Sequence, residues 1–454
     1  MAGDVTIIGA GASGVLVALH LLRERFQGHI TLIERAAQVG EGIAYSTRRA
    51  EHLLNVTAAR MSVFDDDPGH FVRYLAARGD AHDPVGLAAS FAQRRQYADY
   101  LRTTLETART AAPNLDIVRD EALAIRHDGR CRLVLHSGAE LAADVVVLAL
   151  GNWPRAALRE SALALRPGDV VPGWQFEAVA AIDPRHDVCI AGSGLSMVDT
   201  VLTLAAQAHA GAIHLVSRHG LLPLPHVAHG YIDVDLDAFA ALSLAQRARH
   251  LRLLARAAQR RGEPWQWLMD TLRTHNVRWW QTLPETGQRR FLRHAARYWD
   301  VHRHRIPAVA AQTMEALRRG GQLQLHRGRI SAVAAHASQL RVGVEQRARR
   351  EDLRVDRLID CTGLQTDIAR VDEPLVTQLR DAGNIRRGAH GIGIATDAHG
   401  ALIDAHGAVN PCLYTIGSVR IGQLWESVAV PELRQQAAAL ARRIVGMRDQ
   451  SENT

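Results

Sequence analysis

Two glycine-rich loops of one design, about 180 residues apart, constrain this chain more than any other feature. The first is VTIIGAGASGVLVAL, in which a strand-like run leads into Gly9, Gly11 and Gly14 and then into a helix-like run. The second is CIAGSGLSMVDT, with Gly192 and Gly194. In such a unit the glycines let the backbone approach a pyrophosphate, which the helix N-terminus faces. The pair predicts an α/β fold with two Rossmann-like dinucleotide-binding domains.

The end of the second strand in the first unit indicates which nucleotide binds there. The strand HITLIER ends at Glu34, 20 residues after Gly14. An acid at this place hydrogen-bonds a ribose hydroxyl, which predicts a dinucleotide with an unphosphorylated ribose. We expect Ser13 in the loop and Arg35 after the acid to belong to the same site.

The second unit differs at two positions. Met197 occupies the third fingerprint position, so we expect its helix to pack slightly further from the strand. At the place of the acid stand Ser217 and Arg218. A carboxylate would repel a 2′-phosphate, whereas arginine binds one with charge-assisted hydrogen bonds. We therefore expect NADPH rather than NADH here, with Ser196 in the first turn of the helix.

A second internal repeat indicates how the domains are divided. ADVVVLALGN, ending just after Gly151, and VDRLIDCTGL, with Thr362 and Gly363, both run from an aspartate through a strand into a glycine. Each is expected where the chain crosses between the nucleotide domains. The first domain is then discontinuous, with residues 1–150 and 355–454, and residues 151–354 form the second.

A mostly helical insertion is expected over residues 226–324 of the second domain. LAQRARHLRLLARAAQRRGEPW has apolar residues three and four apart, with a basic face that we expect to be mostly solvated. The segment RYWDVHRHRIPA gathers Tyr298, His302, His304 and Arg305. If the segment is extended, the two histidines share a face, but without a third ligand we expect no metal. Either a structural hydrogen-bonding cluster or recognition of a substrate or phosphate explains this segment.

Composition excludes several classes of function. The net charge of +7 suits anionic ligands, and no nucleic-acid-binding motif accompanies it. The four cysteines form no CxxC pair, which argues against a disulfide framework, a zinc site and a dithiol redox motif. No GxSxG elbow is present. No apolar run is long enough for a membrane span and the N-terminus enters a strand at once, so we expect a cytoplasmic protein.

The order of these motifs resembles the flavoproteins that bind two dinucleotides, including the class B monooxygenases and the amine N-hydroxylases. GEGIAYST, HLLNVTAARMSVF, RHGLLPLPH, RRFLRHAARYWDVHRHR and LWESVAVPELR look more closely like one bacterial FAD/NAD(P)-binding family. That family includes a FAD-dependent urate hydroxylase. The blocks are spread over nearly the whole chain.

The resemblance implies further cofactor residues. The stretch after the ribose acid would cover the flavin, with Gly42, Asn55 and Met61 near it. Near the C-terminus, Gly417, Trp425 and Pro431 would belong to the flavin site, with the positive end of a helix aimed at the flavin. Ser418 stands where many of these flavoproteins have an aspartate, so their carboxylate contact to the ribityl chain is not expected. The candidates for the substrate pocket are Asn55, Arg60, His226, Tyr298, His302 and Arg305.

The leading expectation is a FAD-dependent monooxygenase that uses NAD(P)H and O2 to hydroxylate a small substrate. Since the cofactors carry such chemistry, no acid–base pair needs to stand out in the sequence. Conversion of urate to 5-hydroxyisourate is the specific expectation from the resemblance. The alternatives are N-hydroxylation of a small primary amine or amino acid, an NAD(P)H–flavin reductase, and a flavin-binding sensor without turnover.

Overall fold

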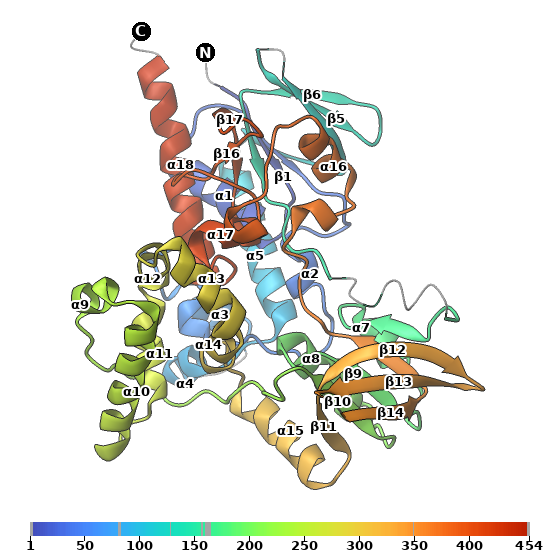
Figure 1. Cartoon of the computed structure of the whole chain (residues 1–454). Coiled ribbons are helices and arrows are strands. Elements are labelled where there is room, and N and C mark those ends of the chain that lie inside the picture. The colour runs from blue at the N-terminus through green and yellow to red at the C-terminus, as the bar shows by residue number, and fades with distance from the viewer. Residues whose placement is uncertain are drawn as a thin grey trace. The chain divides into compact units, whose positions relative to one another are not determined.

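The computed structural model describes residues 3–79, 83–127, 129–155, 158, 165–347 and 349–451. The chain divides into two compact units, each built on a sheet that is parallel or mainly parallel (Figure 1). Unit 1 takes residues 1–48, 56–153 and 365–454, and unit 2 takes residues 49–55 and 154–364. The predicted α/β fold is confirmed.

Unit 1 has a six-stranded sheet in the order β16–β17–β7–β1–β2–β3, in which the edge pair β16–β17 is antiparallel and the other neighbours are parallel. The side chains of β1 and β7 are buried along their whole lengths, as in a sheet covered on both faces. The strands are β1 (Val5–Ile8), β2 (Ile30–Ile33), β3 (Leu115–Val118), β7 (Val145–Leu148), β16 (Ala401–Ile403) and β17 (Val409–Thr415).

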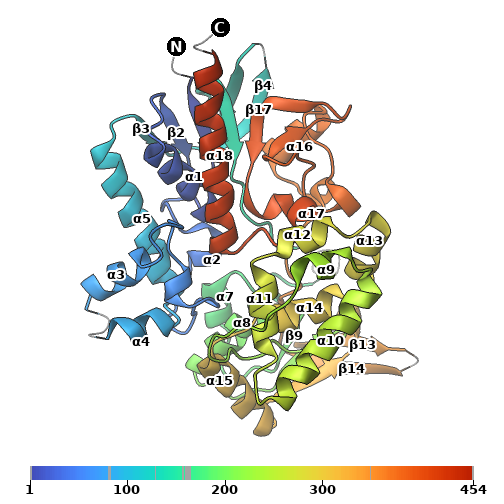
Figure 2. The same cartoon turned by 90° about the vertical axis from the view of Figure 1, so that its left-hand side faces the viewer.

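Both faces of this sheet are covered. Long helices include α1 (Ala12–Arg23), α5 (Arg94–Ala111) and α18 (Val430–Ser451), and α1 runs beside α18 (Figure 2). A hydrophobic core joins the sheet to α16 (Pro374–Asp381) and to an antiparallel sheet of β4 (Ala122–His127), β5 (Cys131–Leu135) and β6 (Glu140–Ala143). The short elements are α2 (Gly42–Tyr45), η1 (Ala58–Arg60), α3 (His70–Ala77), α4 (Pro84–Ala89), η2 (Ile368–Arg370), η3 (Ala389–Gly391), η4 (Gly417–Arg420) and α17 (Ile421–Leu424).

Unit 2 has a five-stranded parallel sheet in the order β11–β10–β9–β15–β8. One core joins it to helices α8 (Leu195–Ala206) and α15 (Ala308–Arg319), near α7 (Phe176–Ala180). Another core joins it to an antiparallel sheet of β12 (Arg329–His336), β13 (Gln339–Gln346) and β14 (Arg349–Val355). The parallel strands are β8 (Val170–Pro172), β9 (Val188–Ala191), β10 (Ile213–Ser217), β11 (Leu323–Arg327) and β15 (Arg357–Asp360).

The internal repeat seen in the sequence is a repeat in hydrogen bonding. In unit 1 the Asp144 carboxylate accepts the N–H of Asp4 at 2.7 Å, and the Asp144 N–H donates to the Asp4 carbonyl at 2.9 Å. In unit 2 the Asp356 carboxylate accepts the N–H of Asp187 at 2.8 Å, and the Asp356 N–H donates to the Asp187 carbonyl at 2.7 Å. Each aspartate thus fixes the amino end of one central strand pair.

The second crossing between units falls later than the sequence predicted. β15 (Arg357–Asp360) begins two residues after Val355. It pairs with β8 and β9 and so belongs to the sheet of unit 2. The chain returns to unit 1 at Gln365 rather than at Val355. The strand pairing, which a single sequence does not display, decides this boundary.

The insertion in unit 2 is helical over α9 (Leu236–Ala241), α10 (Leu244–Arg260), α11 (Gln266–Arg273), α12 (Asn276–Gln281), α13 (Glu285–His294) and α14 (Ala296–Arg303), followed by α15. The extended arrangement considered for His302 and His304 is wrong, because His302 lies in α14 and His304 follows its last residue. Arg247 on the basic face of α10 is buried rather than solvated. Its guanidinium donates to the carbonyl of Leu242 at 2.9 Å and to the hydroxyl of Thr282 at 3.0 Å.

Within the described residues, no helix combines the length and the apolar character needed to cross a membrane.

Candidate functional site

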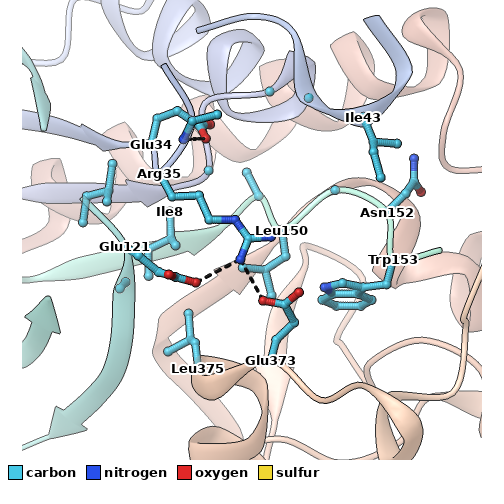
Figure 3. A pocket seen from close by; sticks show the side chains of 18 of the residues that line it. Ile8, Glu34, Arg35, Ile43, Glu121, Leu150, Asn152, Trp153, Glu373 and Leu375 are labelled. Atoms are coloured by element: carbon cyan, nitrogen blue, oxygen red, sulfur yellow. Dashed lines mark hydrogen bonds and ion pairs between the residues drawn. The ribbon is translucent and has the colours of Figure 1, made fainter. Parts of the chain in front are cut away.

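A cavity of about 320 Å³ opens in unit 1 beyond the carboxyl ends of β1, β2 and β7 (Figure 3). Parallel α/β sheets bind their ligands outside these strand ends. Among the expected cofactor residues, Gly9, Gly11, Glu34, Arg35, Gly42 and Gly151 line this cavity. A smaller cavity of about 80 Å³ shares Gly11, Gly42 and Gly151 and adds Ser13. Seven of the expected cofactor residues therefore line these two cavities.

Backbone geometry requires glycine in the first loop. Gly9 has a φ of +99°, and a Cβ atom there would lie 2.4 Å from the carbonyl oxygen of Ala149. A Cβ on Gly14 would lie 1.9 Å from the carbonyl oxygen of Gly9, so α1 packs directly against the turn. Gly40 donates its N–H to the Ala10 carbonyl at 2.7 Å, which returns the stretch after β2 to the same loop.

Glu34 and Arg35 are neighbours at the cavity wall, but Glu34 bonds to the backbone and Arg35 bonds to two acidic side chains. The Glu34 carboxylate accepts backbone N–H groups from Ala10 at 2.7 Å and Ala36 at 2.8 Å. The Arg35 guanidinium reaches across to Glu121 at 2.9 Å and Glu373 at 2.8 Å (Figure 3). These carboxylates, Glu373 first, raise the pKa of Arg35 above its ordinary value. Sequence reasoning missed Glu121 and Glu373, which come from distant elements and match no motif.

Asn152 is a further residue that sequence reasoning missed, although it follows Gly151 directly. Its side chain lines both cavities, and its buried Oδ1 atom has no hydrogen-bond partner among the described residues. A buried carbonyl oxygen without a donor costs free energy unless a ligand supplies one. The tight glycine loop, the ribose-type acid and this orphaned acceptor fit an elongated dinucleotide such as FAD.

Ser418, Val428 and Leu433 of the C-terminal segment line the smaller cavity. Gly417 has a φ of +87°, and a Cβ there would lie 3.0 Å from the Ser13 hydroxyl. The Ser418 hydroxyl donates to the carbonyl of Gly151. α18 begins at Val430, so Pro431 lies in its first turn, where its missing N–H costs nothing. Trp425 has a φ of +62° in the segment that leads to this helix.

The chain from Tyr45 to Met61 contributes unequally. Tyr45 lines the smaller cavity, and burial raises its pKa to about 12, so it is a neutral phenol. Met61 is buried in unit 1, and neither Met61 nor Arg60 lines the two cavities described above. Asn55 belongs to unit 2, where its carbonyl is 3.0 Å from Nε2 of His226.

The second glycine loop repeats the first in unit 2. Gly192 has a φ of +101°, and a Cβ there would lie 2.3 Å from the carbonyl oxygen of Cys361. A Cβ on Gly194 would meet no atom within 4 Å, so the space above this glycine is open to a ligand. Ser196 is the second residue of α8, and Met197 is fully buried beneath it.

The strand ends beside this loop carry the other expected residues. The Ser217 hydroxyl accepts the N–H of Gly220 at 3.1 Å, which shapes the turn after β10. Arg218 is exposed, and among the described residues it has no carboxylate partner. Thr362 donates its N–H and its hydroxyl to Asp360 at 2.9 and 2.6 Å, and Gly363 follows with a φ of +98°.

The substrate-pocket candidates of the insertion lie in polar clusters. Arg305 is buried and paired with Asp270, which also lies 3.4 Å from His229. Burial, and secondarily Arg305, lowers the pKa of His226 to about 4, so this histidine is neutral. The bonding of Arg305 and His226 agrees with the structural interpretation, and recognition of a substrate by them stays a prediction.

Tyr298 and His302 lie on α14. The Tyr298 carbonyl is 2.7 Å from Nδ1 of His302, and the Tyr298 side chain is largely exposed. The described residues contain no cluster of three or more histidine, cysteine or acidic side chains placed to hold a metal ion.

Comparisons with known proteins find a family match to part of the sequence and fold matches to nearly the whole chain. A family described as FAD-NAD(P)-binding matches residues 6–153, which include the glycine loop and most of the residues that line the larger cavity of unit 1. No curated protein matches the sequence.

Solved structures match nearly the whole chain in fold. The ornithine N-hydroxylase of Kutzneria has 16% identity and a TM-score of 0.65, with 99% of this chain and 100% of that chain covered. The L-lysine 6-monooxygenase of Pseudomonas syringae has 19% identity and a TM-score of 0.69, with 97% and 99% covered. The bacillithiol disulfide reductase of Staphylococcus aureus has 13% identity and a TM-score of 0.59, with 98% and 99% covered. At these identities the likeness establishes the fold.

Proposed function

We propose that this protein is a FAD-dependent monooxygenase that takes reducing equivalents from NADPH and adds one oxygen atom of O2 to a small molecule. The observation that carries the proposal is the pair of glycine loops with opposite neighbours. The first has the Glu34 carboxylate beside it, and the second is followed by the exposed Arg218. One loop therefore suits a ribose with free hydroxyls and the other a ribose that carries a phosphate.

The residues of unit 1 would hold FAD, which supplies hydride acceptance and reaction with O2 when bound. The loop from Gly9 to Gly14 would face the pyrophosphate, and Glu34 would accept the ribose hydroxyls. Asn152 would accept a hydrogen bond from the cofactor through its unpartnered Oδ1. The amino end of α18 would favour negative charge on the flavin.

A primary amine is the substrate class that we favour. The ornithine and lysine hydroxylases share the fold along nearly the whole length of both chains, which supports this alternative above urate. Hydroxylation of urate to 5-hydroxyisourate, the expectation from the sequence, receives no support from these comparisons. Transfer of electrons without oxygenation remains the alternative within the same fold, as the bacillithiol disulfide reductase illustrates.

The decisive experiment follows oxygen and product together. Purified protein with FAD is given NADPH and O2, with ornithine, lysine, a diamine or urate, and the product is examined by mass spectrometry for one added oxygen atom. A hydroxylamine formed in proportion to the NADPH oxidised supports the proposal. An oxygenated urate product would overturn the amine assignment, and hydrogen peroxide alone with every compound would overturn the monooxygenase.

A further inference from the structure

Three arginines gather around the turn that follows β10 in unit 2. Arg218 comes directly after this strand, and Arg327 is the last residue of the neighbouring β11, paired in register with Ser217. The side chain of Arg327 runs beside Gly220, where a Cβ atom would lie 3.4 Å from the Cβ of Arg327. Burial, then Arg218, Arg297 and Arg327 in that order, lowers the pKa of His219. The three guanidinium groups therefore share one electrostatic neighbourhood.

Arg297 connects the helical insertion to the second glycine loop. Its Nη2 atom donates to the Ser193 carbonyl at 2.7 Å and to the Ser193 hydroxyl at 3.0 Å. The same atom lies 3.4 Å from the carbonyl of Leu221. Ser193 stands between Gly192 and Gly194, so the guanidinium is fixed beside the loop that faces a pyrophosphate. A guanidinium has several N–H donors, and these contacts use only one of its nitrogens.

Like charges brought together in this way repel one another, which destabilises the protein without a bound anion. Asp300 is the carboxylate that acts on Arg297. Among the described residues, neither Arg218 nor Arg327 forms an ion pair with a carboxylate. The positive charge of the three arginines is therefore not balanced by carboxylates where the strands end.

We propose that these arginines form a receptor with two phosphate subsites for NADPH. Arg297, held on the glycine loop, contacts the pyrophosphate, while Arg218 and Arg327 at the strand ends contact the 2′-phosphate. The inference rests on the proposed function, because it takes the ligand of unit 2 to be a nicotinamide dinucleotide. Neither Arg297 nor Arg327 belongs to the glycine motif, and the first comes from the insertion.

Binding, rather than turnover, tests this division. The FAD-loaded protein is titrated by calorimetry with NADP⁺, NAD⁺ and 2′-AMP, which carries the 2′-phosphate but no pyrophosphate. For Arg327→Gln we expect NADP⁺ and 2′-AMP to bind roughly tenfold or more weakly and NAD⁺ to bind as before, since one charge-assisted contact is lost. For Arg297→Gln we expect NADP⁺ and NAD⁺ to weaken by a similar factor, while 2′-AMP is unaffected.

Two further variants guard against indirect effects. Arg329→Gln, on the exposed surface two residues from Arg327, should leave all three affinities unchanged. Arg297→Lys keeps a charge at the loop and should restore part of the lost dinucleotide affinity, which a merely misfolded loop would not. Unchanged discrimination between NADP⁺ and NAD⁺ in Arg327→Gln, or loss of 2′-AMP binding in Arg297→Gln, would overturn the receptor alone. Wild-type protein that binds neither dinucleotide would overturn the proposed function and the receptor with it.

Discussion

The Glu34 carboxylate accepts the backbone N–H of Ala10 at 2.7 Å, which ties the end of β2 to the glycine loop after β1. Its other oxygen accepts the N–H of Ala36 at 2.8 Å. Carboxylate oxygens can each accept more than one hydrogen bond, so this acid can serve the loop and a ribose together.

The charge of Glu34 should matter more to FAD than to folding. In Glu34→Gln the amide oxygen still accepts the N–H of Ala10, but the amide nitrogen cannot accept the N–H of Ala36, so the melting temperature should fall by no more than the loss of one exposed hydrogen bond. FAD affinity should fall by about tenfold or more, because a hydrogen bond to a charged acceptor contributes about 1.5–3 kcal/mol. Fluorescence titration with FAD measures this, with Glu140→Gln on the exposed surface of β6 as the control. Equal FAD affinity in both variants would show that Glu34 does not contact the cofactor.

Removal of the orphaned acceptor should separate stability from cofactor binding. Asn152→Leu replaces a half-buried side chain whose buried Oδ1 has no partner among the described residues. The apoprotein should be as stable as the wild type or more so, since an unsatisfied polar group costs about 1–3 kcal/mol. FAD should bind more weakly and raise the melting temperature less. A less stable apoprotein with unchanged FAD affinity would contradict the assignment.

Two glycines of the second loop should behave differently when replaced by alanine. Gly194→Ala introduces a Cβ that meets no atom of the protein within 4 Å, so the fold should be unaffected. The same Cβ occupies the open space that a pyrophosphate would approach, so NADP⁺ affinity should fall at least about tenfold. Gly192→Ala places a Cβ 2.3 Å from the Cys361 carbonyl and should lower both stability and affinity. Calorimetric titration and thermal unfolding of the two variants test this difference.

The neutral His226 should make unit 2 sensitive to acid. Burial lowers its pKa in the folded protein to about 4, below the ordinary value of 6.5. Between these values the unfolded chain binds the proton more readily, so stability is retained above about pH 6.5 and is lost as the pH falls towards about 4. The loss from this residue is on the order of 3 kcal/mol.

His226→Gln provides the comparison, because glutamine retains a donor but does not titrate. Its free energy of unfolding should decline less than that of the wild type over the same pH interval, as measured by urea denaturation. Parallel declines would show that His226 is not a source of the acid sensitivity.

The sequence predicted what local chemistry determines. The run before Gly9 and the run before Gly192 are both buried strands, because continuous apolar segments ahead of a glycine loop suit the centre of a parallel sheet. Glu34 was found by its spacing from Gly14, and it lies in the cavity wall. Arg218 was found in the same way and lies exposed at the end of β10.

Features that depend on distant partners were not predictable in this way. The boundary at Val355 was misplaced because β15 is assigned to unit 2 by its pairing with β9. An extended segment was considered for His302, but this residue lies in α14. Its Nδ1 contacts the Tyr298 carbonyl one helical turn earlier. The place of Arg297 beside the second glycine loop was not predicted, because it depends on hydrogen bonds to Ser193, which lies about 100 residues earlier in the chain.

The two aspartate bonds at the amino ends of the central strand pairs have a consequence for how the molecule tolerates change. Asp144 and Asp356 fix the strand register at the amino ends of the central strands, opposite the glycine loops at the carboxyl ends. Length variation at the carboxyl ends therefore need not shift the alignment of the strands. Between β10 and β11 the chain accommodates the whole series of helices from α9 to α15, yet Ser217 still pairs with Arg327. Because the strands are fixed at their amino ends, the loops at their carboxyl ends can change in length and sequence, and so in the ligand they bind, without shifting the strands.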